Sequence, residues 1–166
     1  MSGRSEFESQ KDKSARSLAA LTGIGKTEVN NSINRSINVG LAKLDRVDSE
    51  LSVNEKSLYE FIVYGLKYVF PVKPAELTRG IPTAFAAPIF NNKLMSAGET
   101  IFVWPDANSK QMGQAISPLY KTVTKAIVND ENLYGYLALV DAIRIGNARE
   151  SNFAKKELAK RMQINL

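Results

Sequence analysis

The sequence predicts a mainly α fold, in which an N-terminal helix-turn-helix, with or without a wing, precedes a C-terminal helical region with one or two short strands. Three observations predict it. Apolar residues recur at helical spacing in several segments, which is typical of amphipathic helices. Glycines and prolines stand between those segments and end them. Among the other stretches, "TIFVWP" at 100–105 has the β-branched and aromatic content of a strand.

The composition divides the chain into a polar arm, a helix-turn-helix region and a helical core. We expect the arm to be disordered, because Phe7 is its only large apolar side chain. The core would hold the dimerisation or effector surfaces. The three regions are residues 1–13, 14–53 and 54–166.

The helix-turn-helix region begins with a short helix that Ser14 can cap and that "TGIG" breaks after Leu21. A second helix is expected at 26–39, with Gly40 as its C-terminal stop. Residues 41–53 can then form a short β-hairpin, which would be the wing.

The third region is predicted to open with a helix at 55–70, because "SVNE" is a capping box in which Ser52 accepts and Glu55 reaches back. Residues 71–100 are expected to form an ordered loop, followed by the strand at 100–105. Three further helices are expected to start at Ser117, Asp130 and Ala148.

The composition also excludes classes of site. The 166 residues contain no Cys and no His, which excludes disulfides, zinc sites built from those residues and His-based catalysis. No close carboxylate cluster offers a magnesium site, so we expect no metal, no cofactor and no enzyme. No apolar run approaches the roughly 20 residues that span a bilayer. The polar start is no secretory signal, and a cytoplasmic protein without membrane contact is expected.

The net charge of +5 favours acidic partners. The excess is uneven, since residues 149–166 hold five Lys and Arg against two Asp and Glu, whereas residues 1–50 hold eight against seven. A nucleic-acid-binding surface near the N-terminus would therefore have to place few cations well.

The stretch "ALTGIGKT" at 20–27 matches two incompatible motifs. With alanine accepted for the first glycine it is a degenerate phosphate-binding loop, and with Gly23 at the bend it is the turn of a helix-turn-helix. A phosphate-binding loop follows a buried strand, but "KSARSLA" before it is helical. The helix-turn-helix also explains Ala19 as the small residue facing the next helix, and Val29 and Ile33 as apolar locks. An ordinary helical hairpin stays open as the alternative.

The helix at 26–39 carries an apolar stripe of Val29, Ile33 and Ile37, with four Asn on its other sides. Four Asn are unfavourable for helix stability, so we interpret their face as one that contacts DNA bases. The second helix of such a motif enters the major groove with its N-terminal half, where Asn can pair with adenine. The expected base-contacting residues are Lys26, Thr27, Asn30, Asn31 and Asn34, and the expected phosphate-contacting residues are Arg16, Arg35, Lys43 and Arg46.

The rest of the chain resembles a family of bacterial winged helix-turn-helix proteins of the MarR-like type. The blocks that carry the resemblance are "EFIVYGLKYVFP", "LTRGIPTAFAAP", "VWPD", "PLYKTV" and "LYGYLALVDAIRIGNARE". It covers roughly residues 14–162 and implies a regulatory DNA-binding protein; family members are often predicted antitoxin-like partners of nucleotidyltransferases. Family members usually have an apolar helix ahead of the motif. Here residues 1–13 are polar, so we expect either that this segment is truncated or that another helix, such as the C-terminal one, covers Leu18 and Ile33.

These observations together predict a sequence-specific DNA-binding transcriptional regulator. We expect a homodimer on a pseudo-palindromic operator, because one recognition helix with so little charge would bind weakly alone. The helices at 55–70 and 130–145 are candidates for the dimer surface or for the core. The alternative is an antitoxin-like interaction module that docks on an operon-encoded protein partner through the apolar loop 77–90.

The loop 77–90 has two further interpretations. One is an effector pocket, in which Arg79 binds an anion and Phe85 and Trp104 form the walls. The other is a structural loop that packs over the helix at 55–70.

Overall fold

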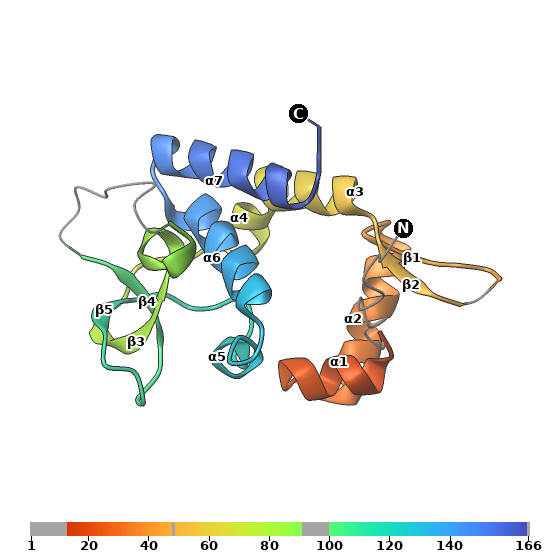
Figure 1. Ribbon diagram of the computed structural model, residues 1–166, viewed down its shortest axis with the longest axis horizontal. Helices are drawn as coiled ribbons and strands as arrows, with labels where there is room; N and C mark the ends of the chain where they lie inside the picture. Colours follow the sequence, from red (N-terminus) through yellow and green to blue (C-terminus); the bar gives the residue numbers. More distant parts are fainter. Residues whose placement is uncertain (1–12, 48, 91–99, 166) are drawn as a thin grey trace, which may run out of the picture.

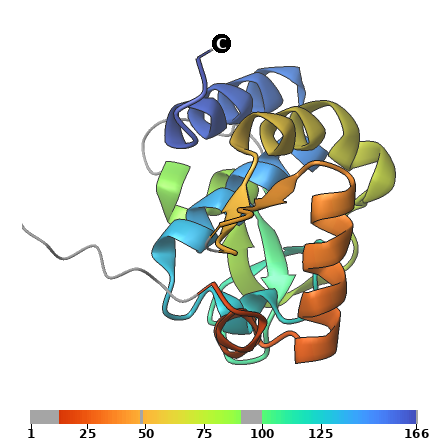
Figure 2. The same ribbon diagram turned by 90° about the vertical axis from the view of Figure 1, so that its right-hand side faces the viewer.

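The structure is a computed structural model that describes residues 13–47, 49–90 and 100–165 (Figure 1). Two helices and a hairpin, formed by residues 15–53, lie at one end, and the remaining helices surround a second small sheet (Figures 1 and 2). The arm expected at residues 1–13 lies outside the described residues except for Lys13, whose ammonium pairs with the Glu50 carboxylate at 2.9 Å. None of the described helices is long and apolar enough to span a membrane.

Helix α1 (Ala15–Thr22) and helix α2 (Lys26–Asn38) lie close to the predicted bounds. Ser14 caps α1, because its side chain accepts a hydrogen bond from the backbone N–H of Ser17. Gly23 ends α1 with a φ of 71°, a left-handed conformation that glycine adopts without strain. The cap and the glycine turn are thus both confirmed.

The predicted hairpin is present, with β1 (Ala42–Leu44) antiparallel to β2 (Leu51–Val53). Asn54 donates two hydrogen bonds at the base of this hairpin. Its backbone N–H donates to the carbonyl of Leu41, and its side-chain amide donates to the carbonyl of Gly40. The hairpin is therefore tied to the end of α2.

A continuous helical run follows, made of α3 (Glu55–Glu60), the π-helical η1 (Phe61–Gly65) and α4 (Leu66–Val69). The capping box expected from Ser52 is wrong, because Asn54 is the N-cap and its side chain accepts from the N–H of Ser57. Asn is as good an N-cap as Ser, and Asn54 stands two residues nearer the helix than Ser52. Within η1 the ring of Phe61 lies against Gly65, where a Cβ would stand 3.2 Å from it.

The prediction of a mainly α fold with one or two short strands is wrong. About 52% of the described residues are helical, and the described strands form a second sheet beside the hairpin. Its strands are β3 (Leu77–Thr83), β4 (Phe102–Pro105) and β5 (Met112–Ala115). β3 pairs antiparallel with both of the others, and β4 and β5 pair in parallel, so the sheet closes on itself. The strand predicted at 100–105 is β4.

Strand β3 lies in the segment that was expected to form an ordered loop. Gly80 and Pro82 are unfavourable in strands, so this segment carries no clear strand signal. The structure supplies the reason for the glycine. A Cβ on Gly80 would stand 2.2 Å from the carbonyl oxygen of Trp104 on β4. The close approach of the two strands therefore requires a residue without a side chain. After β3 the chain forms two short 3₁₀ turns, η2 (Ala84–Ala86) and η3 (Pro88–Phe90).

The prediction of a helix that starts at Ser117 is also wrong, because the helix in this region, α5, spans only Val123–Ala126. The backbone N–H of Ile116 donates to the carbonyl of Val103, and the Ile116 side chain is buried. This continues the pairing of β5 and delays the helix. The last two helices match the prediction: α6 (Glu131–Ile145), capped by Asp130, and α7 (Ala148–Arg161), with a capping box of Asn147 and Glu150.

Helix α6 lies at the centre of the molecule, with α7 and the run from α3 to α4 on one side and the β3–β4–β5 sheet on the other (Figures 1 and 2). A large apolar cluster joins α6 to α7 and η1, and a smaller one surrounds Trp104. Tyr134 of α6 links helix and sheet, since its hydroxyl donates to the carbonyl of Pro82. Burial raises the pKa of Tyr134 to about 12.

Asp141 of α6 is almost fully buried and accepts hydrogen bonds from three side chains of the core. The hydroxyl of Thr83 donates at 2.8 Å, the indole N–H of Trp104 at 2.7 Å, and the guanidinium of Arg144 at 2.7 Å. Burial raises the pKa of Asp141, and the three donors oppose that rise. Arg144 also donates to the carbonyl of Phe70. The group therefore joins α6, the sheet and the end of α4.

Candidate nucleic-acid interface

The candidate interface is the outer side of α2 together with the β1–β2 hairpin. All five residues expected to contact bases are exposed: Lys26, Thr27, Asn30, Asn31 and Asn34. On the opposite side Val29 is buried, and Ile33 and Ile37 are half-buried. The amide-bearing side and the aliphatic side of α2 are thus separated as the four-residue spacing of the apolar positions predicts.

The turn between α1 and α2 is held by local hydrogen bonds. The hydroxyl of Thr22 donates to the carbonyl of Leu18 and accepts from the backbone N–H of Ile24. In both views α1 lies across one end of α2 rather than alongside it (Figures 1 and 2). This crossing differs from an antiparallel helical hairpin, and it leaves the N-terminal half of α2 open on its outer side.

The hairpin projects from the body beside α2 (Figure 1). Lys43 and Arg46 are exposed on it, and Val47 near its turn is almost fully exposed. Arg16 is exposed on α1. Three cations expected to contact phosphates are therefore available to a ligand that lies along α2.

Arg35 differs from those three cations. Its guanidinium is 2.6 Å from the Glu28 carboxylate and 2.9 Å from the Ser32 hydroxyl, all on α2. The hydrogen bond from Arg35 lowers the pKa of the Glu28 carboxyl. The positive charge of Arg35 is thus balanced within the helix. Glu28 lies two turns before Arg35 on the same face, a spacing that the sequence already contained.

The N-terminal unit docks on the body through α5. The Thr122 hydroxyl donates to the carbonyl of Thr22 at 2.8 Å, and the Lys125 side chain lies against Gly23. An apolar cavity of about 310 Å³ remains between this unit and α3, lined by residues that include Leu18, Ile33 and Leu58. Leu18 and Ile33 therefore face α3 across a space and are not covered by α7.

The residues expected for an effector pocket at 77–90 lie in different surroundings. Arg79 is exposed on β3, Phe85 packs on Phe90, and Trp104 is 1% exposed with its N–H bound to Asp141. Most of the segment is covered by α6, and Leu77 is its one large apolar side chain exposed to solvent. The segment is structural, as in the second interpretation, but it packs mainly on α6 rather than on the helix at 55–70 that this interpretation named.

Two features of the structure were not predicted from the sequence: the hydrogen-bonded group around the buried Asp141 and a cavity beside Glu55.

The described residues contain no cluster of three or more acidic side chains that could hold a metal ion. Comparisons of the chain with protein-family models, curated proteins and solved structures gave no match. The MarR-like resemblance therefore stays a prediction.

Proposed function

We propose that this protein binds double-stranded DNA in a sequence-specific manner and regulates transcription, with α2 in the major groove. The observation that carries the proposal is the outer side of α2. It exposes three Asn and a Thr within the first three turns, while its aliphatic side faces α1, β1 and the 310 Å³ cavity. A helix of this diameter fits the major groove of B-form DNA.

The chemistry of that side suits base edges. The side-chain amide of an Asn can donate its N–H to adenine N7, and its oxygen can accept from the adenine N6 amino group, which makes a bidentate pair. Asn30 and Asn34 lie one turn apart on the same face, so they can contact neighbouring base pairs. Lys26 and Thr27 stand at the N-terminal end of the helix, where contacts to guanine, a thymine methyl or a phosphate are in reach.

The exposed cations would position the helix rather than specify sequence. Arg16 lies on α1 and Lys43 and Arg46 lie on the hairpin, the elements that precede and follow α2 in the chain. Contacts of such cations with phosphates fix orientation and carry no sequence information directly. Their small number favours binding as a homodimer, in which two copies double the contacts on a pseudo-palindromic site.

The homodimer surface is assigned to the outer side of the α3–α4 run. Seven of the fifteen residues of α6 are buried and only the first two are exposed, which leaves little of the helix for a partner. In the α3–α4 run Tyr64 is 70% exposed and Tyr68 is 74% exposed. Glu60 and Lys67 are exposed on either side of Tyr64 along the chain. A two-fold axis near Tyr64 would place each Glu60 beside the Lys67 of the second copy, which suits an isologous interface.

The dimer proposal predicts the effect of exchanging charges. Glu60→Lys should weaken the dimer by like-charge repulsion, and adding Lys67→Glu should restore it. Sedimentation equilibrium on the wild type and both variants measures this directly. Tyr120→Glu, an exposed aromatic outside the run, is the control and should leave the mass unchanged. A wild type that sediments as a monomer at all concentrations would contradict the dimer.

The DNA proposal is tested by selecting bound duplexes from a random-sequence pool and measuring affinity for the winning site against salt. We expect a recurrent two-fold-related sequence. With three exposed phosphate-contacting cations in each of two copies, a log–log salt slope of about −5 is expected. A pool that shows no enrichment after selection would contradict base-specific contact. A tight complex with a neighbouring gene product, in the absence of any DNA binding, would favour the interaction-module alternative.

A further inference from the structure

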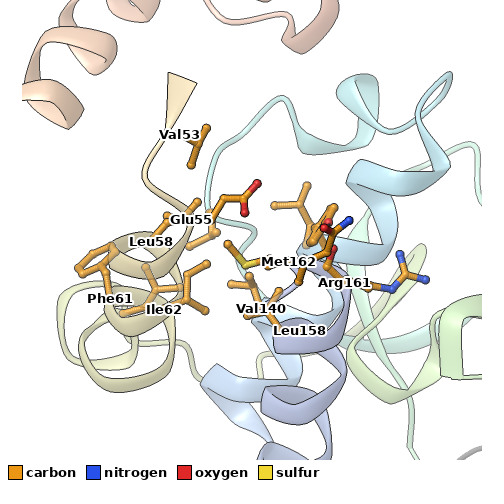
Figure 3. A pocket seen from close by; sticks show the side chains of 14 residues that line it. Val53, Glu55, Leu58, Phe61, Ile62, Val140, Leu158, Arg161 and Met162 are labelled. Carbon is orange, nitrogen blue, oxygen red and sulfur yellow. The ribbon is translucent and has the colours of Figure 1, made fainter. Parts of the chain in front are cut away.

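An apolar cavity of about 490 Å³ lies where the N-terminal unit joins the C-terminal helices (Figure 3). Val53 at the end of β2 and Leu58 and Ile62 of the α3–α4 run line one side, and Val140 of α6 and Met162 after α7 line the other. The volume is in the range of pockets that hold small organic ligands. Nothing in the proposed DNA contact uses this space.

The two charged residues at the edge of the cavity, Glu55 and Arg161, point in different directions. The exposed Glu55 carboxylate is turned toward the space between the lining side chains, whereas the Arg161 guanidinium points away from it (Figure 3). The Arg161 guanidinium is held beside Gly135 of α6, 6.0 Å from the Tyr136 ring centroid, and it lies 3.9 Å from Glu157. The cavity therefore offers an apolar body and one negative charge.

We propose that this cavity binds a lipophilic cation, with the apolar part among Leu58, Val140 and Met162 and the positive charge beside Glu55. An apolar ligand that fills the cavity removes water from one side of the carboxylate, which is unfavourable unless an opposite charge replaces it. A cation supplies that charge. A neutral ligand leaves the carboxylate partly desolvated, and an anion adds repulsion.

Tetraphenylphosphonium and tetraphenylborate give a matched test, because they have the same shape and opposite charge. Isothermal titration calorimetry of each ion is done with the full chain and without DNA, so the result is independent of the proposed function. We expect the phosphonium to bind with one site per chain and at least about tenfold more tightly than the borate, a difference that one charge contact can supply.

Variants locate the site. Glu55→Gln should reduce phosphonium affinity about tenfold and remove the preference between the two ions. Glu131→Gln is the matched control and should bind like the wild type, because Glu131 is an exposed carboxylate at the first position of α6, as Glu55 is of α3, and lies outside the cavity. Leu58→Trp should fill the cavity and abolish binding, and a thermal melt of this variant shows whether it is folded.

Three results would overturn the proposal: neither ion binds, both ions bind equally, or Glu55→Gln keeps the full preference for the phosphonium. Because Glu55 is exposed at the start of α3, its isosteric replacement leaves the packing intact. The Glu55→Gln measurement therefore decides the matter even if Leu58→Trp fails to fold.

Discussion

Replacing Asp141 by Ala is expected to lower the free energy of unfolding by about 3–5 kcal/mol, as removal of one partner of a buried ion pair does. The side chains of Asp141 and Arg144 are each only 2% exposed. Without the carboxylate, the Arg144 guanidinium loses its ionic partner, and the Trp104 N–H and the Thr83 hydroxyl lose their acceptor. The free energy of unfolding of a small protein is about 5–15 kcal/mol in total. This single substitution should therefore remove a large share of the stability.

Equilibrium unfolding in urea, followed by Trp104 fluorescence and by circular dichroism, measures the loss. Glu131→Ala is the matched control, because Glu131 is an exposed carboxylate on the same helix; it should shift stability by no more than about 0.5 kcal/mol. Asp141→Asn should fall between the two, since it keeps one acceptor oxygen but loses the charge. A loss below about 1 kcal/mol in Asp141→Ala would contradict the structural role given to this group.

The contacts of Asp141 illustrate which parts of the fold can be predicted from sequence patterns and which cannot. Helices α2, α6 and α7 were predicted with nearly their observed bounds, because their signals are local: apolar spacing, an N-cap and a glycine stop. The partners of Asp141 are 37 and 58 residues away in sequence for Trp104 and Thr83. No local spacing marks such a contact, so Trp104 was assigned to an effector pocket.

The second sheet was missed for a related reason. Gly80 and Pro82 locally indicate a break, and β3 tolerates them only because of what it packs against. The glycine is required by the backbone of β4, and that strand pairs with β3 across an intervening segment of the chain. β5, "MGQA", is short and lacks an apolar alternation, so it carries no strand signal of its own. Tertiary pairing decided both strands.

The candidate interface could be predicted from the sequence better than the β3–β4–β5 sheet could. Which side of α2 is exposed follows from its own apolar spacing, so the five expected base-contacting residues are all on the outside. Arg35 was assigned to DNA phosphates, but it pairs with Glu28. The cavity beside Glu55 depends on how four separate segments meet, and no pattern within one segment reveals it.

Asn30→Ala and Asn34→Ala are each expected to weaken binding to the selected DNA site by roughly 5- to 150-fold, the equivalent of about 1–3 kcal/mol for a bidentate base contact. Binding to a scrambled duplex should change little, because phosphate contacts supply that affinity. Both side chains are exposed, and Ala is a better helix former than Asn. A loss of affinity would therefore come from the missing amide and not from unfolding of α2.

Asn38→Ala is the matched control for these two substitutions. Asn38 is exposed and is the last residue of α2, beyond the N-terminal half that enters the groove in this geometry. It should change affinity for the selected site by less than about twofold. Fluorescence anisotropy with the selected and scrambled duplexes at one fixed salt concentration compares all four proteins. If Asn38→Ala weakens binding as much as Asn34→Ala, the end of α2 that contacts the bases has been assigned wrongly. If all three variants prefer the selected duplex over the scrambled duplex as strongly as the wild type does, α2 is not the element that contacts the bases.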